Sequence, residues 1–215
     1  DGRLLHDGQQ CLPRSLIDAA RPAAAALMHP LNLRIIQQLN SLPSPLQPLS
    51  HVIPRFGDIQ WLHDVEQVPE GDDAGYGEFT STIDVLVMGS GSFEKILEFP
   101  EWPYPMPVVV LSKSLKEVPA HLQEKVRIES ASPQELVTKL AAEGYKHVYL
   151  DGGKVIQSFI RAGLVDDMIV TQIPVLIGAG RPLFGELEKD VNLRHEWTKT
   201  WDNGFVQSKY LLVYA

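Results

Sequence analysis

The chain has 215 residues, of which 44% are hydrophobic and 21% charged, and its formal net charge is −8. These values are typical of one globular domain with a sizeable core, and the acidic balance argues against a general nucleic-acid binder. The single cysteine, Cys11, excludes an internal disulfide framework or a multi-cysteine zinc site, and without an apolar membrane span or a secretory signal pattern we expect a cytoplasmic protein.

The first 56 residues differ in character from the rest. They contain proline-rich stretches such as SLPSPLQPLSHVIP, in which proline removes backbone donors and fixes φ. LNLRIIQQL, residues 31–39, fits a short helix or a strand equally well. We therefore expect residues 1–56 to be an atypical, loosely ordered N-terminal extension, and residues 57–215 to form the folded domain.

From Gly57 onward, apolar runs alternate with amphipathic stretches. The expected strands cover residues 84–89, 106–112, 125–130, 147–150 and 167–177, and the expected helices cover residues 75–83, 92–99, 132–144 and 154–163. Apolar strands separated by helices indicate a mainly parallel sheet covered on both faces. Residues 192–215 predict an antiparallel hairpin with Asn203-Gly204 as a two-residue turn. The predicted fold class is α/β, a three-layer αβα mixed sheet with a C-terminal antiparallel hairpin.

The helix at 132–144 has the clearest ends. Ser132 is suited to the N-cap position, Pro133 to the first helical position and Glu135 to the third, which together make a capping box. Gly144 is suited to end this helix.

Three of the predicted strands end in glycines, within VMGSGSFEK, YLDGGKVIQ and VLIGAGRPLF. In parallel sheets, ligands bind at the carboxyl ends of strands, where helix N-termini favour anions. Adjacent glycines let backbone N–H groups approach a phosphate. The three strand ends together favour an anionic dinucleotide or a phosphosugar, although neither the G-x-G-x-x-G fingerprint nor the GK[ST] motif is present.

These segments also carry a family resemblance. DVLVMGSGSFEKILEFPEWPYPMPVVVLS, VYLDGGKVIQSFIRAGLVDDMIVTQIPVLIGAGRPLF and the final hairpin resemble, in this order, the dihydrofolate reductase superfamily. The most similar branch contains the reductase domain of bacterial riboflavin biosynthesis. The resemblance covers about residues 57–215. It implies a homodimeric, NADPH-dependent reductase of a pterin-, pyrimidine- or ribosylamino-pyrimidine-like small molecule.

The resemblance also implies which residues bind the cofactor. By position, one phosphate cradle would consist of Gly89, Ser90, Gly91 and Ser92, and the other of Gly152, Gly153, Lys154 and Val155. The far wall would include Pro174, Gly178 and Gly180.

Two departures from the family pattern affect these expectations. The family usually has arginine where this chain has Ser90, and without that guanidinium NADH becomes a candidate cofactor beside NADPH. Relatives also begin with a buried strand ending in a SLDG-like stretch, which residues 1–56 do not match. The alternative is therefore a non-catalytic nucleotide-binding or interaction protein that has lost a complete active site.

A catalytic carboxylate is harder to assign. Dihydrofolate reductases place one on the helix before the MG strand, and Asp73, with Glu78 nearby, lies at about that position. Acidic residues are also common at helix starts for reasons of capping and charge, so a purely structural role for Asp73 stays open. The seven histidines lack the spacings of metal-binding motifs, and we expect no metal site.

Overall fold

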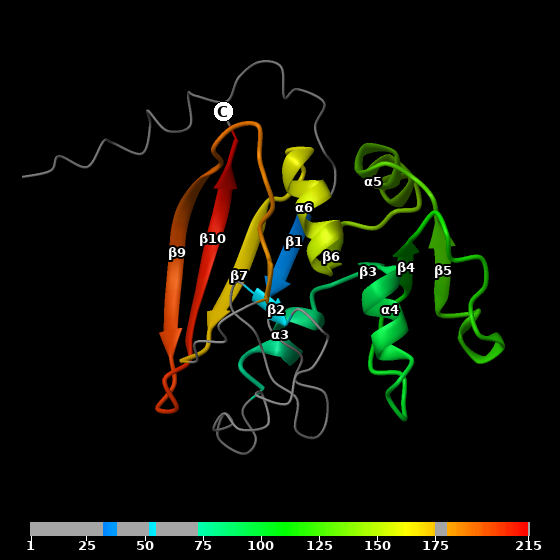
Figure 1. Cartoon of the computed structure of the whole chain (residues 1–215), viewed down its shortest axis with the longest axis horizontal. Coiled ribbons are helices and arrows are strands. Elements are labelled where there is room, and N and C mark those ends of the chain that lie inside the picture. The colour runs from blue at the N-terminus through cyan, green and yellow to red at the C-terminus, as the bar shows by residue number, and fades with distance from the viewer. Residues whose placement is uncertain (1–31, 38–51, 55–72, 175–179, 215) are drawn as a thin grey trace, which may run out of the picture.

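The computed structural model describes residues 32–37, 52–54, 73–174 and 180–214. Eight strands form one sheet in the order β5-β4-β3-β6-β1-β7-β10-β9 (Figure 1). Their bounds are β1 Asn32–Gln37, β3 Val85–Gly89, β4 Val108–Leu111, β5 Val126–Glu129, β6 His147–Asp151, β7 Asp167–Gln172, β9 Asn192–Thr200 and β10 Val206–Val213. The strands from β5 to β7 are parallel, whereas β10 pairs antiparallel with β7 and β9 with β10. The predicted mixed sheet with a closing hairpin is confirmed.

Helices cover both faces of this sheet. They are α3 Tyr76–Thr80, α4 Ser90–Ile96, α5 Pro133–Ala142 and α6 Gly153–Arg161, with a short 3₁₀ helix, η3, at Ala120–Leu122. Successive strand residues point to opposite faces. In β3, Val85 and Val87 pack in the same hydrophobic cluster as α5 and α6, whereas Leu86 and Met88 pack with α3 and α4. This produces the expected three layers.

Strand β1 corrects the expected domain boundary. It lies in the middle of the sheet, where Asn32 pairs with His147 of β6 and Arg34 pairs with Asp167 of β7. Residues 32–37 therefore belong to the folded domain, and their placement in an N-terminal extension is wrong. The sequence pattern could not place β1 because its pairing partners, β6 and β7, come from much later in the chain. Of the remaining residues up to 56, only 52–54 are described, as strand β2 (Val52–Pro54), which pairs antiparallel with β8 (Gly180–Pro182).

One helix and one strand have other ends than the sequence predicts. Helix α4 begins at Ser90 instead of Ser92, because the chain turns directly from β3 into the helix with Gly89 as its extended N-cap. Strand β7 ends at Gln172, before Pro174, and residues 175–179 lie outside the described residues.

The hairpin between β9 and β10 is confirmed, but its two-residue turn is wrong. The N–H of Trp201 donates to the carbonyl of Phe205 at 3.0 Å, and the N–H of Gly204 donates to the carbonyl of Trp201 at 2.9 Å. A two-residue type I′ turn needs two consecutive positive φ angles. Only Gly204 has one, at 84°, so the loop is longer than predicted.

The predicted capping box of α5 is confirmed in full. The Ser132 hydroxyl accepts from the N–H of Glu135 at 3.3 Å, and the Glu135 carboxylate accepts from the N–H of Ser132 at 2.8 Å. Gly144 follows the helix with a φ of 90°, as expected of a C-terminal glycine.

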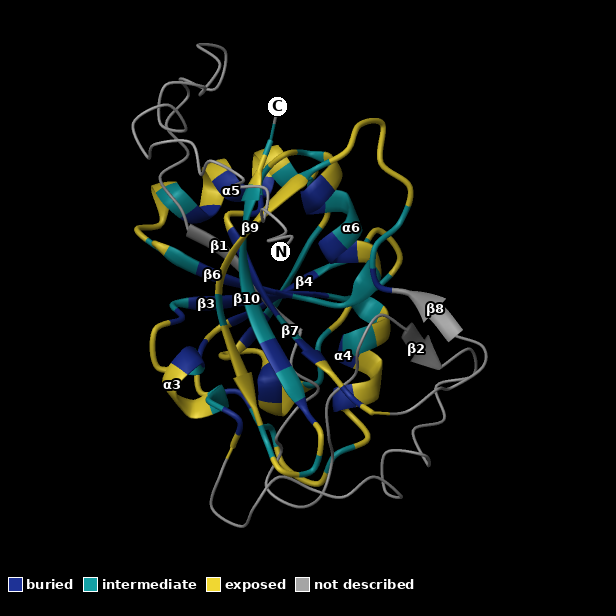
Figure 2. Cartoon of the chain, turned by 90° about the vertical axis from the view of Figure 1, so that its left-hand side faces the viewer, coloured by how far each residue is buried: buried dark blue, intermediate teal, exposed yellow. Residues whose placement is uncertain are grey.

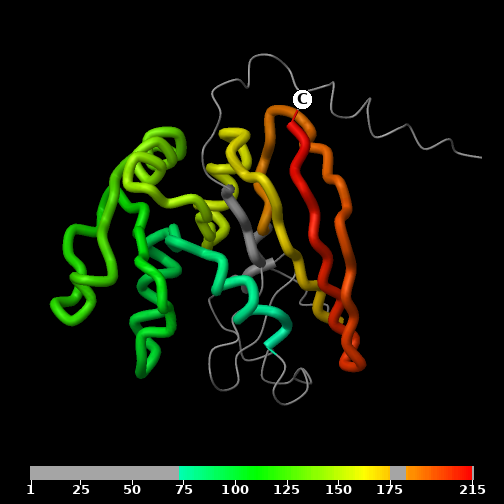
Figure 3. Tube along the Cα trace, turned by 180° about the vertical axis from the view of Figure 1, so that it is seen from behind, coloured from blue at the N-terminus to red at the C-terminus, as the bar shows by residue number. Residues whose placement is uncertain are grey.

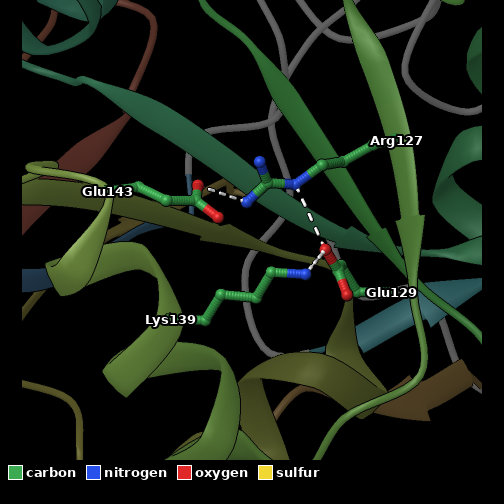
Figure 4. A network of polar contacts seen from close by, with 4 residues as sticks. All are labelled: Arg127, Glu129, Lys139 and Glu143. Atoms are coloured by element: carbon green, nitrogen blue, oxygen red, sulfur yellow. Dashed lines mark hydrogen bonds and ion pairs between the residues drawn. The ribbon is translucent and has the colours of Figure 1, made fainter.

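A network of ion pairs connects α5 to the edge strand β5 (Figure 4). Arg127 Nη2 lies 2.6 Å from Glu143 Oε2, and Arg127 Nε lies 3.3 Å from Glu129 Oε1, which also pairs with Lys139. The side chains of Arg127 and Lys139 are 39% and 49% exposed, and partly solvated pairs of this kind contribute little individually to stability.

Strands β3, β4, β6 and β7 consist mostly of buried residues, which are dark blue in Figure 2. The hairpin and β5 occupy opposite ends, which is clearest from behind in Figure 3. Eight of the nine residues of β9 are exposed. Within the described ranges, no helix has the length and apolar character that crossing a membrane requires.

Candidate active site

Two of the predicted glycine strand ends lie side by side. Strands β3 and β6 are neighbours, with Met88 opposite Asp151. A Cβ atom added to Gly152 would lie 2.6 Å from Ser92 Oγ and 3.7 Å from the backbone nitrogen of Gly89. A Cβ atom added to Gly89 would lie 3.4 Å from Val155 Cγ2. Gly89, Ser92, Gly152 and Val155 therefore surround one point at the carboxyl edge of the sheet, which we call the glycine cradle.

Two helices begin at the glycine cradle. Helix α4 starts directly after Gly89, and α6 starts at Gly153 directly after Gly152. Among the described residues, no side chain caps the N-terminus of either helix. The first-turn N–H groups are thus left for a ligand or water, and both helix dipoles favour an anion there.

Gly152 and Gly91 lack a side chain for different reasons. Gly152 has a φ of 85° and a ψ of 126°, a conformation that L-residues rarely adopt, and a Cβ there would also collide with Ser92. At Gly91, in the first turn of α4, a Cβ would meet no atom within 4 Å. Gly91 is therefore not required by the packing of the protein itself, and its space is free for a ligand.

Asp151 is a site residue that the sequence analysis missed. It ends β6 directly before Gly152, and its carboxylate accepts hydrogen bonds from the Ser92 hydroxyl and the Gly152 N–H. Burial raises the pKa of this carboxyl, and the two hydrogen bonds only partly offset the effect. Its accessible surface is nonetheless intermediate, so it borders both the interior and solvent. The available signal was an acid at the end of a buried strand, next to a glycine pair.

Three tyrosines lie within the electrostatic influence of Asp151. Burial, followed by the negative charge of Asp151, raises the pKa of Tyr76 to about 12. The same two causes raise the pKa of Tyr104 and of Tyr149. Tyr104 and Tyr149 pack in the hydrophobic cluster on the α3 and α4 side of the sheet, and Tyr76 begins α3. We call Tyr76, Tyr104 and Tyr149 the tyrosine cluster.

Tyr149 is the most buried member of the tyrosine cluster, at 1% exposure. Its ring meets Phe79 edge to face, with centroids 5.3 Å apart. Its hydroxyl has no hydrogen-bond partner among the described residues, which is costly for a buried polar group. A strand pattern such as HVYL identifies Tyr149 as a core residue but does not indicate this unpaired hydroxyl.

The predicted catalytic carboxylate has a structural role. Asp73 is exposed, and its two carboxylate oxygens accept from the N–H groups of Gly75 at 2.9 Å and Gly77 at 2.6 Å, at the start of α3. These bonds account for an acid at this position, and a catalytic role for Asp73 stays a prediction. Groups of three or more potential metal ligands are absent from the part of the chain that the structure describes.

The predicted far wall is only partly described. Pro174 is exposed, and its Cγ would lie 3.2 Å from a Cβ on Gly204, so it packs against the hairpin turn. The strand that precedes it, β7, is separated from β6 by β1. Gly180 begins β8, opposite Pro54, and Gly178 is outside the described residues. Cofactor contacts by these three residues stay predictions, as do those of Gly153 and Lys154 at the start of α6.

Comparison with known proteins adds the family. The family model of the RibD C-terminal domain matches residues 58–207. The chain belongs to the RibD C-terminal domain family. Among relatives in this family, the uncharacterized protein YwjB of Bacillus subtilis (strain 168) is 30% identical over 158 residues, which cover 72% of this chain and 87% of YwjB.

Solved structures agree with this family assignment. A protein from Shewanella sp. PV-4, assigned to riboflavin biosynthesis, is 32% identical and superposes with a TM-score of 0.75 over 86% of this chain and 99% of its own. The diaminohydroxyphosphoribosylaminopyrimidine deaminase/5-amino-6-(5-phosphoribosylamino)uracil reductase of Thermotoga maritima shares the fold, with a TM-score of 0.57 at 11% identity over 85% of this chain and 57% of its own. This last similarity shows that the two proteins share the fold.

Proposed function

We propose that this chain is an NAD(P)H-dependent reductase of a pyrimidine- or pterin-like small molecule. The observation that carries the proposal is the glycine cradle, where two uncapped helix N-termini meet beside Asp151, a carboxyl with a raised pKa. The family assignment and the fold shared with a uracil reductase support it.

The residues of the cradle fit a dinucleotide. The N–H groups at the start of α4 and α6 would bind its phosphates, and the open space at Gly91 would allow close approach. When bound, the nicotinamide supplies a hydride. This chain would supply the matching proton, and Asp151 is the candidate donor, because burial raises the pKa of its carboxyl at the edge of the cradle.

Replacing Gly91 by alanine tests the proposal directly. In the free protein the new Cβ meets no atom within 4 Å, and alanine favours the helix by about 0.5–1 kcal/mol over glycine, so the melting temperature should not fall. If a phosphate approaches this backbone, the methyl group should weaken NADPH binding roughly tenfold. Quenching of tryptophan fluorescence by NADPH measures the affinity. A wild-type protein that binds neither NADPH nor NADH at millimolar concentration would refute the proposal.

Ser90 decides between the two cofactors. It is the first residue of α4 and is partly exposed, so a longer side chain has room. We expect Ser90→Arg to tighten NADPH binding by roughly tenfold, since a charge-assisted hydrogen bond contributes about 1.5–3 kcal/mol. NADH binding, which involves no 2′-phosphate, should change less. Equal effects on both cofactors would show that the arginine does not reach that phosphate.

A second function, non-catalytic nucleotide binding, rests on Ser90 as a departure from the family pattern. The position of β1 weakens this alternative, because the sheet contains a strand between β6 and β7. Steady oxidation of NADPH in the presence of a pyrimidine or pteridine would exclude it. Binding of NADPH without any oxidation across both substrate classes would favour it.

A further inference from the structure

The turn that leads into α3 has an unusual backbone conformation. Ala74 has a φ of 53°, which makes it the one non-glycine residue with a positive φ in the described part of the chain, and Gly75 follows with a φ of 79°. Ala74 is also buried, at 5% exposure. Left-handed conformations of this kind cost about 1–3 kcal/mol and persist only where the surroundings enforce them. Something must therefore hold Ala74 in place.

The N–H of Tyr76 closes the turn by donating to the carbonyl of Asp73 at 3.1 Å, and one buried side chain from the sheet bonds the Ala74 carbonyl. Gln207 Nε2 donates to the carbonyl oxygen of Ala74 at 3.2 Å and to Thr171 Oγ1 at 3.1 Å. Gln207 on β10 and Thr171 on β7 are directly paired in the sheet, and their exposures are only 2% and 0%. We call Ala74, Thr171 and Gln207 the α3 clamp. It fixes the start of α3 to the antiparallel end of the sheet.

Helix α3 depends on this attachment because it has little stability of its own. It is five residues long and buries a single residue, Phe79, whereas isolated helices of this length do not form in water. Its buried residue Phe79 meets Tyr149 of β6 edge to face at 5.3 Å, and Tyr76 lies one turn before Phe79. Asp151 follows two residues after Tyr149 and so lies on the same face of the sheet. Ala74, the clamp residue that accepts from Gln207, therefore lies two residues before Tyr76 in the chain.

We propose that Gln207 is a positioning residue, which holds the strained Ala74 carbonyl so that α3 presents Tyr76 to Asp151. The geometric part of this proposal stands on the hydrogen bonds and the backbone angles. The consequence for reduction rests on the proposed function. The hydrogen bonds of the clamp join β7, β10 and the start of α3, whereas the glycine cradle lies at the ends of β3 and β6. We therefore expect the clamp to affect substrate reduction more than cofactor binding.

The geometric part can be tested without any enzyme activity. The full chain is labelled with 3-fluorotyrosine, which lowers the phenol pKa enough for titration of the folded protein by ¹⁹F NMR. The chain has six tyrosines, and the Tyr76 resonance is identified by its loss in Tyr76→Phe. Gln207→Met keeps the length of the side chain and removes the donor. We expect the Tyr76 phenol to ionise at lower pH in this variant, shifted toward free fluorotyrosine, because it loses burial and moves away from Asp151.

Matched variants separate positioning from general destabilisation. Thr171→Val should shift Tyr76 in the same direction as Gln207→Met, whereas Thr171→Ser, which keeps the hydroxyl, should restore the wild-type titration. Val137→Ala creates a cavity in α5 on the opposite face and should leave Tyr76 unchanged. The proposal fails if Tyr76 titrates identically in wild type, Gln207→Met and Thr171→Val, or if Val137→Ala shifts it equally. Thr171→Val decides the question if Gln207→Met does not fold.

Steady-state kinetics then test whether the clamp affects substrate reduction. In Gln207→Met we expect kcat to fall roughly ten- to a hundredfold, the effect of misplacing a group by about 1 Å, with the Kd of NADPH unchanged. Thr171→Ser should retain the wild-type kcat. An unchanged kcat in Gln207→Met would overturn the positioning role even if the ¹⁹F titration shifts. If the wild-type protein does not oxidise NADPH, the proposed function fails, while the ¹⁹F titration still decides whether the clamp positions Tyr76.

Discussion

Replacing Gly152 by alanine should abolish measurable NADPH binding and destabilise the protein by about 1–3 kcal/mol. The φ of 85° places a non-glycine residue under strain, and the added Cβ would lie 2.6 Å from Ser92 Oγ. Ser92 would have to move away, and with it the hydrogen bond that it donates to Asp151. Fluorescence titration with NADPH and urea unfolding of the free protein measure the two effects.

Gly144→Ala is the matched control for this variant. Gly144 has nearly the same φ, 90°, but a Cβ there meets no atom within 4 Å, and it ends α5 away from the glycine cradle. We expect it to lose only the roughly 1–2 kcal/mol of a left-handed backbone and to bind NADPH as the wild type does. If Gly152→Ala also binds NADPH normally, the cradle does not hold the cofactor.

Asp151→Asn should lower the reductase rate by roughly 10²- to 10⁴-fold, the usual contribution of a general acid, and at the same time stabilise the protein at neutral pH. Burial raises the folded-state pKa of Asp151. The associated stability is therefore present below the unfolded-state pKa and is lost as pH rises through the folded-state pKa. Asparagine carries no charge to bury, so the variant should escape this loss. Urea unfolding at acid and neutral pH measures the difference.

Asp84→Asn should show the opposite dependence on pH and is the control for Asp151→Asn. Burial acts to raise the pKa of Asp84, but hydrogen bonds from the N–H groups of His147 and Lys146, at 2.8 and 2.7 Å, lower it overall. Its stabilising effect is present above the unfolded-state pKa and is lost as pH falls through the folded-state pKa. The variant should be less stable at neutral pH and equal to wild type in acid. If Asp151→Asn behaves in the same way, Asp151 is a structural acid and not a buried functional one.

The sequence by itself determined the features that depend on neighbouring residues. The capping box around Ser132 and Glu135 was predictable because its hydrogen bonds span three residues. The alternation of β3, α4, β6 and α6 was predictable from local hydrophobic patterns, and their parallel order from the connecting helices. The meeting of Gly89 and Gly152 follows from the same topology, since carboxyl ends of parallel strands lie at one edge.

Only the tertiary structure decided the features that arise between distant segments. The place of β1 depends on pairing with β6 and β7, which the run LNLRIIQQL does not specify. The raised pKa of Asp151 depends on burial by other elements, and the buried carbonyl of Ala74 accepts its hydrogen bond from Gln207, 133 residues later in the chain. Local patterns carry information about propensity, whereas burial, strain and buried polar contacts are created when the chain brings its remote parts together.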